Sequence, residues 1–181
     1  MGNEDKSGHE RARQPHHTIQ DRITVAEAGL THDEVSVLTV LRLFCTTYAN
    51  PESQAWENGF DCALSSFGPN HGPILGPAIM NVMRSLRCTR KSNFRFTNPG
   101  CPCCRATLSD HELHMMRLLK AERRGDGPTR QTCAVILCEG EDPGLFLASI
   151  SELAGRLNAF APQTPSARKN SKSRRLNFFY R

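Results

Sequence analysis

The sequence contains no long apolar run, few aromatic residues and no segment of the secretory-leader type. A membrane-spanning helix needs roughly 20 consecutive apolar residues, and no stretch of this chain approaches that length. The opening segment, MGNEDKSGHERARQPHHTIQ, lacks the apolar region of a signal peptide. Mean hydropathy is −0.47. We therefore expect a cytoplasmic protein with no membrane partner.

The motifs of several common enzyme classes are also missing. We find no nucleophile elbow, no glycine loop of the phosphate-binding type and no H-E-x-x-H zinc helix. No interval in the repeat-protein range is repeated, which argues against a solenoid. These absences favour a binding protein over an enzyme.

The chain is long enough for one compact domain and short for two. It has 181 residues, of which 38% are hydrophobic and 23% charged. Residues 1–22 are polar and show no apolar period, so we expect a disordered N-terminal arm. Residues 161–181 carry six basic residues and no acidic one, and we expect a basic, disordered tail. The folded domain is therefore predicted to span residues 23–160.

Apolar residues recur at helical spacing through most of this domain. Thr31 with Glu34, and Ser109 with Glu112, have the spacing of capping boxes that start helices. The predicted helices cover residues 31–49, 50–67, 74–88, 109–124 and 142–160. The run CAVILC at 133–138 suits a buried strand or a buried helix, and we favour a helix because its neighbours are helical. The predicted fold is all-α, a single compact bundle of about five or six helices.

Cysteine is the most informative residue type. Eight cysteines in a chain without a signal peptide indicate reduced thiols or metal ligands rather than disulfides. Residues 101–114 read CPCCRATLSDHELH, which is C-x2-C followed by H-x2-H. Cys101 and Cys104 can wrap a turn around one ion, and His111 and His114 lie about one helical turn apart on one face. We predict a structural zinc knuckle within residues 88–114, between the third and fourth helices, with a spacing unlike that of a classical finger.

Other ligand sets remain open. Cys88, Cys101 and either Cys103 or Cys104 make four ligands with one histidine. The four thiolates of Cys88, Cys101, Cys103 and Cys104 could instead hold an iron–sulfur cluster, although no standard cluster spacing is present. The histidines also suit an exposed helix turn without any metal, and Cys103 or Cys104 suits a redox-sensing thiol. The remaining cysteines are expected in the core: Cys45, Cys62, Cys133 and Cys138.

Positive charge is concentrated around this segment. Residues 84–124 contain ten Lys and Arg against three Asp and Glu, with Phe94 and Phe96 interleaved. This pattern is typical of phosphate contact with some base stacking. The predicted nucleic-acid contacts are Arg84, Arg87, Arg90, Lys91, Arg95 and Arg105. The alternative is that these cations solvate the C-terminal ends of helices, where the macrodipole favours them.

The predicted function is that of a small cytoplasmic regulatory protein with a structural metal site, which binds nucleic acid through a basic face and acts in transcription regulation. The first alternative is a protein-interaction adaptor acting through the helical core or the aromatic tail, residues 168–181. The second alternative is a cysteine-based redox or iron–sulfur sensor.

Overall fold

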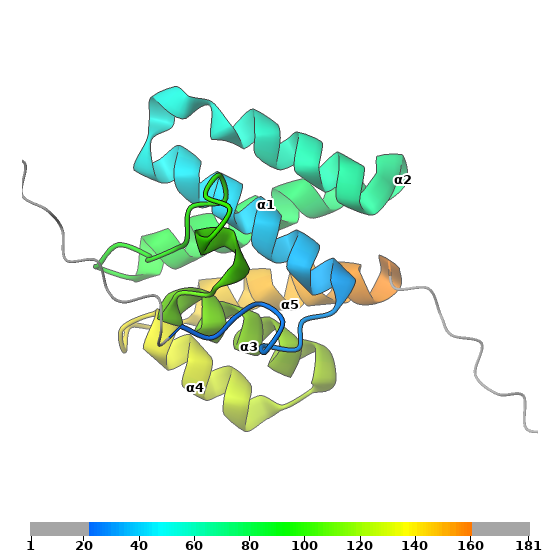
Figure 1. Ribbon diagram of the computed structural model, residues 1–181. Helices are drawn as coiled ribbons and strands as arrows, with labels where there is room; N and C mark the ends of the chain where they lie inside the picture. The colour runs from blue at the N-terminus through cyan, green and yellow to red at the C-terminus, as the bar shows by residue number, and fades with distance from the viewer. Residues whose placement is uncertain (1–21, 161–181) are drawn as a thin grey trace, which may run out of the picture.

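The computed structural model describes residues 22–160, and these residues form an all-α domain (Figure 1). The helices are α1 (His32–Ala49), α2 (Ala55–Thr89), α3 (Asp110–Arg124), α4 (Gly127–Leu137) and α5 (Gly144–Phe160). Two single 3-10 turns, η2 (Pro51–Ser53) and η3 (Cys104–Ala106), interrupt the connections. Within the described range the only β-type pairing is an isolated bridge between Thr24 and Thr107. The predicted fold class is confirmed, whereas the predicted tail at 161–181 and the arm before residue 22 lie outside the described residues.

The two predicted capping boxes both start helices. The backbone N–H of Glu34 donates to the Thr31 hydroxyl, and the N–H of Thr31 donates to the Glu34 carboxylate at 3.0 Å. The same reciprocal pair joins Ser109 and Glu112 at the start of α3, with distances of 3.2 and 2.8 Å. Each box satisfies two backbone N–H groups that would otherwise lack a partner in the first turn. The starts of α1 and α3 are therefore set by local sequence.

Helix α2 unites two helices that the sequence predicts separately. It reverses at Gly68, where φ is 76° and ψ is 173°, and its second arm returns beside the first (Figure 1). A left-handed φ favours glycine, and Pro69 follows it directly. The arms meet closely at Gly72, because a Cβ there would lie 2.5 Å from the Cα of Leu64. Glycine at both positions lets the chain turn back within a few residues.

The core is one cluster of buried side chains from all five helices, in which α2 packs against α1 and α5, and α3 packs against α4 and α5. Its largest fully buried side chains include Phe44, Phe146, Leu38, Leu41, Ile79 and Met83. The segment predicted as helix at 133–138 lies in α4 and its C-terminal cap, so the preference for helix is confirmed. Of the four cysteines predicted in the core, Cys45, Cys133 and Cys138 are buried and Cys62 is half-buried. No helix among residues 22–160 is both long and apolar enough to cross a bilayer.

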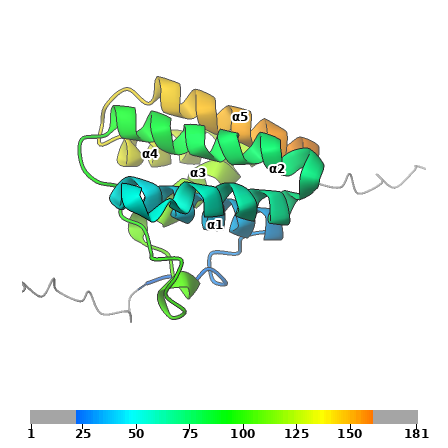
Figure 2. The same ribbon diagram turned by 90° about the horizontal axis from the view of Figure 1, so that it is seen from above.

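The connection between α2 and α3, residues 90–109, projects from one side of the helices (Figure 2). Residues just before α1 pair with its end. The N–H of Val25 donates to the carbonyl of Ala106 at 2.9 Å, and the N–H of Leu108 donates to the carbonyl of Ile23 at 2.9 Å. This connection holds the residues that the sequence singles out for chemistry.

Candidate metal centre

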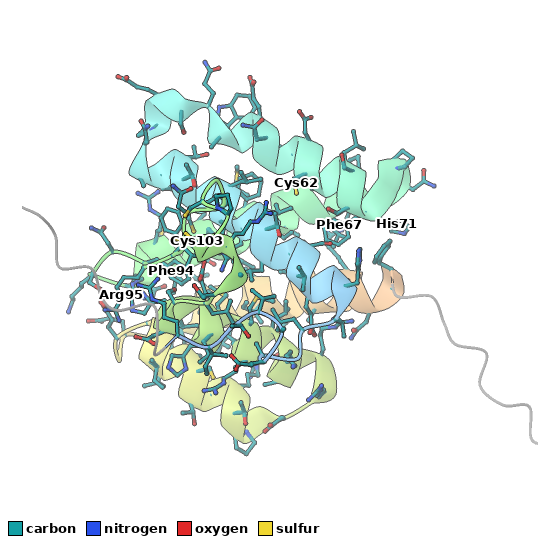
Figure 3. All side chains as sticks on the ribbon, in the orientation of Figure 1. Cys62, Phe67, His71, Phe94, Arg95 and Cys103 are labelled. Atoms are coloured by element: carbon teal, nitrogen blue, oxygen red, sulfur yellow. The ribbon has the colours of Figure 1, made fainter. Side chains whose placement is uncertain are left out.

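Three thiols gather on the loop before α3. The Sγ atoms of Cys101 and Cys103 are 3.1 Å apart, and those of Cys103 and Cys104 are 4.0 Å apart. All three sulfur atoms lie within 4.8 Å of one another. Cys103 is exposed and the other two are half-buried, so solvent reaches the group (Figure 3). We call Cys101, Cys103 and Cys104 the thiol cluster. It is a possible metal-binding site because thiolates are preferred ligands of zinc and copper(I).

Consecutive turns bring these sulfur atoms together. The Asn98 side chain accepts from the N–H of Gly100 at 2.8 Å, and the Asn98 carbonyl accepts from the N–H of Cys101 at 3.2 Å. The chain then tightens into η3, where the N–H of Arg105 donates to the Cys101 carbonyl at 3.0 Å. Residues 98–100 therefore form a turn, and it leads the chain straight into the cluster.

The two predicted histidine ligands lie outside the thiol cluster. The Nδ1 atom of His111 accepts a hydrogen bond from the backbone N–H of Arg95 at 2.8 Å, and its ring lies 5.5 Å from that of Phe94. The Nδ1 atom of His114 is 4.0 Å from the Sγ atom of Cys133. The expected spacing on one helix face is present, but that face packs against residues 94–95 and against α4. The structure therefore does not bring Cys101, Cys104, His111 and His114 into one group.

Electrostatics agree with this role for His111. Burial lowers its pKa, and the nearby cations Arg90 and Arg95 lower it further. A neutral ring keeps a lone pair on Nδ1, which is the acceptor that the Arg95 N–H requires. His111 thus fixes the connection to α3 through an ordinary hydrogen bond.

Cys88 is also separate from the thiol cluster. It lies exposed on the last turn of α2 and does not belong to the group formed by the other three sulfur atoms. An iron–sulfur cluster held by four thiolates needs a fourth cysteine. The described residues gather three.

The thiols of Cys101 and Cys104 differ in pKa. Hydrogen bonds from the Cys103 thiol and from the backbone of Cys104 lower the pKa of Cys101 to about 7. The pKa of Cys104 is raised to about 11, chiefly because its thiol interacts with that of Cys101. Near neutral pH, the cluster thus holds one readily formed thiolate beside thiols that can donate to it. A divalent ion bound by all three sulfurs would displace the remaining protons.

A buried ion pair holds both ends of the cysteine loop. The Arg42 guanidinium donates to the carbonyls of Arg105 at 2.8 Å and Thr107 at 2.6 Å. Its Nε atom lies 2.7 Å from the Glu112 carboxylate, which also accepts the backbone N–H of Thr97 at 3.0 Å. Thr97 precedes the loop and Arg105 follows the cysteines. The sequence gives no signal for Arg42, which sits among apolar residues of α1 far from its partners along the chain.

Arg90 belongs to the interior rather than to a basic surface. It is buried, and it donates to the carbonyl of Leu137 at 3.0 Å, the Glu139 carboxylate at 3.0 Å and the carbonyl of Ser92 at 2.8 Å. The charge count along the sequence does not reveal these partners. The guanidinium is committed to anchoring the start of the 90–109 connection against the end of α4.

The other predicted nucleic-acid contacts are exposed: Arg84, Arg87, Lys91, Arg95 and Arg105. Two of them have carboxylate partners. Lys91 pairs with Glu141. Arg95 lies 3.4 Å from Asp110, and both side chains are well exposed, so this pair is weak. Positive charge on this side of the domain is thus partly compensated.

A cleft of about 570 Å³ lies between the C-terminal ends of α1 and α2 and the segment that follows α2. Residues that line it include Tyr48, Arg87, Lys91, Asn93, Phe94 and Phe96. The Arg87 guanidinium lies 3.9 Å above the centre of the Tyr48 ring. Phe94, which lines the cleft, and its neighbour Arg95 lie on the side of the domain opposite Phe67 and His71 (Figure 3). We call this feature the basic cleft.

Comparison with protein-family models, curated proteins and solved structures finds no match to this chain.

Proposed function

We propose that this chain is a small cytoplasmic regulatory protein that binds nucleic acid and whose cysteine loop is held by a zinc ion. It acts as a binding protein rather than an enzyme. The observation that carries this proposal is the continuity of two features: the wall of the basic cleft, which ends at Phe96, runs along the chain into the thiol cluster. The Arg42–Glu112 pair fixes the backbone between and after them, through hydrogen bonds at Thr97, Arg105 and Thr107. A metal on the loop would then stabilise the cationic surface beside it.

The donor set supports zinc. Zinc forms bonds of about 2.3 Å to thiolate sulfur, and in a tetrahedral arrangement this places sulfur atoms about 3.8 Å apart. The observed separations, 3.1 and 4.0 Å for two pairs and below 4.8 Å for all, bracket that value. Cys101, Cys103 and Cys104 would hold the ion, which would supply a crosslink within the loop. Eight cysteines without a disulfide support a reducing compartment.

The surface charge supports a polyanionic partner. Arg84, Arg87 and Arg105 are exposed and form no ion pair with a residue in the range 22–160. Each can contact a phosphate, and binding of this kind weakens steeply as salt rises because counterions are released. Nucleic acid is the polyanion whose bases would also use the aromatic side chains of the cleft.

Two measurements on the purified full-length protein test this proposal. Elemental analysis is expected to find one zinc per chain, lost in Cys101→Ser/Cys103→Ser/Cys104→Ser and retained in the control Cys88→Ser, whose thiol lies outside the cluster. Fluorescence anisotropy with a labelled oligonucleotide is expected to show salt-dependent binding that the triple variant weakens. If the protein contains no zinc, or binds nucleic acid equally well with and without it, the proposed link between zinc binding and nucleic-acid affinity is wrong. If the protein binds no nucleic acid, the proposed function is wrong.

The short contact between Cys101 and Cys103 favours one second candidate, a redox-sensing thiol pair. Hydrogen peroxide would form an S–S bond between the two sulfurs, which lose their two hydrogens as the peroxide is reduced to two waters. The 3.1 Å separation needs little loop movement for this step. Mass spectrometry of zinc-free protein after mild peroxide treatment would detect the loss of two hydrogens. No such loss, or the same loss in Cys101→Ser, rejects this candidate.

A further inference from the structure

Arg87 differs from its cationic neighbours in what it contacts. Arg90 and Lys91 pair with the carboxylates of Glu139 and Glu141. The Arg87 guanidinium instead stacks on the Tyr48 ring at 3.9 Å, and no hydrogen bond or ion pair to it is found within residues 22–160. Stacking uses the face of the guanidinium and leaves the N–H groups at its edge available. Arg87 is thus an oriented donor fork with no acceptor among the described residues.

A fork of this kind matches a phosphate. The planar guanidinium presents parallel N–H donors that bind two phosphate oxygens at once, and holding the side chain against a ring reduces the rotamer entropy lost on binding. The residues that line the basic cleft include no carboxylate, and its cations are Arg87, Arg90 and Lys91. Because Arg90 and Lys91 pair with Glu139 and Glu141, Arg87 is the cation that remains for a ligand. The cleft therefore favours an anion over a neutral or cationic ligand.

The rest of the lining suits an aromatic ring. Phe94 and Phe96 are half-buried, so each exposes part of its ring to the cleft. Asn93 is exposed beside them and offers both an amide donor and an amide acceptor. The volume of about 570 Å³ falls in the range of roughly 300–1,000 Å³ in which proteins enclose a small organic ligand. A ligand with a phosphate, an aromatic ring and polar atoms on the edge of that ring would match these residues, and a nucleotide has all three.

We infer that the basic cleft binds one unpaired nucleotide of a single-stranded nucleic acid, with Arg87 on its phosphate and Phe94 and Phe96 against its base. This inference rests on the proposed function and makes it more specific. Bases in a duplex hide their faces in the stack, and a recessed aromatic site reaches a base only when the strand is single or the base is displaced. Single strands should therefore bind more tightly than duplexes of the same sequence.

The experiment compares Arg87→Gln with Arg84→Gln in the zinc-loaded full-length protein. Arg84 is exposed on the same arm of α2, less than one turn earlier, and does not line the cleft. The probes are fluorescein-labelled oligonucleotides about 12 nucleotides long: single-stranded DNA, single-stranded RNA of the same sequence, and the DNA duplex. Anisotropy gives the dissociation constants at fixed salt. A 2-aminopurine base in the single strand reports stacking by a change in its fluorescence.

Loss of a base contact, or of a hydrogen bond to a charged group, typically lowers affinity by about 5- to 150-fold. We expect Arg87→Gln to lower single-strand affinity within that range, and Phe94→Leu to reduce the 2-aminopurine response, which Phe96 would partly preserve. Arg84→Gln should lower single-strand and duplex affinity by the same factor, because a phosphate contact outside the cleft does not depend on whether the bases are paired. Arg87→Lys keeps the charge without the fork and should restore only part of the loss. Denaturation curves identify any variant that fails to fold.

The outcomes separate the two proposals. Equal affinity for single strand and duplex, with equal losses in Arg84→Gln and Arg87→Gln, overturns the nucleotide site and leaves general nucleic-acid binding in place. No binding of any probe, even at low salt, overturns both. A difference between the DNA and RNA single strands would identify which sugar the cleft accepts.

Discussion

Arg42 of α1 and Glu112 of α3 form an ion pair with Nε and Oε1 2.7 Å apart, and the two side chains are 4% and 0% exposed. Both side chains have further hydrogen-bond partners: Arg42 donates to two backbone carbonyls at the end of the cysteine loop, and Glu112 accepts a backbone N–H as part of the capping box of α3. Burial of two charges costs free energy unless such partners are present. The pair thus ties α1, α3 and the loop into one polar centre.

Removal of one partner should be strongly destabilising. Arg42→Met leaves the Glu112 carboxylate buried without its cation, and we expect the free energy of unfolding to fall by about 3–5 kcal/mol. Urea denaturation at neutral pH measures the change. Arg156→Met is the control, because Arg156 pairs with Glu152 on the exposed face of α5 and should cost no more than about 0.5 kcal/mol. Similar losses in the two variants would show that the buried pair has no special role.

Acid should remove one contribution to stability in a defined window. Hydrogen bonds from the Ser92 hydroxyl and from the backbone N–H groups of Ser92 and Lys91 lower the pKa of Glu139 to about 2. The unfolded value is about 4.3. Because the folded pKa is the lower one, the contribution is complete above the unfolded value and disappears as pH falls toward 2. Glu139→Gln should be less stable than the native chain at pH 7, and urea curves should converge near pH 2; a constant difference contradicts this assignment.

The reversal of α2 should tolerate no side chain at Gly72. A Cβ there would meet the Cα of Leu64 at 2.5 Å and the carbonyl oxygen of Ala63 at 2.9 Å, which are backbone atoms that cannot swing away. We expect Gly72→Ala to destabilise the fold by about 1–3 kcal/mol. Gly155→Ala is the matched control on α5, where a Cβ meets nothing within 4 Å. That variant should gain up to about 1 kcal/mol from helix propensity, and thermal unfolding of the two should shift in opposite directions.

Thiol labelling should divide the cysteines into three groups. Buried thiols, including Cys45, whose pKa burial raises, and Cys138, whose pKa burial raises to about 11, should react with iodoacetamide only after unfolding. Cys88 should react with or without zinc. The thiol cluster should react in zinc-free protein and be protected when zinc is added. Peptide mass spectrometry reads each site, and equal protection of Cys88 would mean that zinc acts on more than the cluster.

Local rules predicted the helices well because their signals lie within a few residues. The capping boxes at Thr31 and Ser109 start α1 and α3 as predicted. The run at 133–138 lies in α4 and its C-terminal cap, as expected. Periodicity also predicted both arms of α2, but the predicted start of the first arm at residue 50 is wrong, because the 3-10 turn η2 precedes α2, which begins at Ala55. The sequence did not indicate how closely the arms approach at Gly72. Such close approach depends on the path of the backbone, which propensity does not describe.

The site was harder to predict because its partners are distant in sequence. Spacing placed His111 and His114 on one helix face, but it could not show that the Nδ1 atom of His111 accepts a hydrogen bond from the backbone N–H of Arg95. Charge counting placed Arg90 on a surface, whereas Glu139 and the end of α4 enclose it. Three of the six predicted ligands do come together, and these are the ones joined by a single short turn.

The three cysteines of the cluster lie within four successive residues, 101–104, in the connection between α2 and α3. An ion can therefore arrive and depart without any helix separating from its neighbours. Exchange would proceed at the rate at which sulfur–metal bonds break, independently of the much slower opening of the whole domain. If the cluster binds an ion, its occupancy would follow the free ion concentration around it, and the same polypeptide would load and release the ion repeatedly.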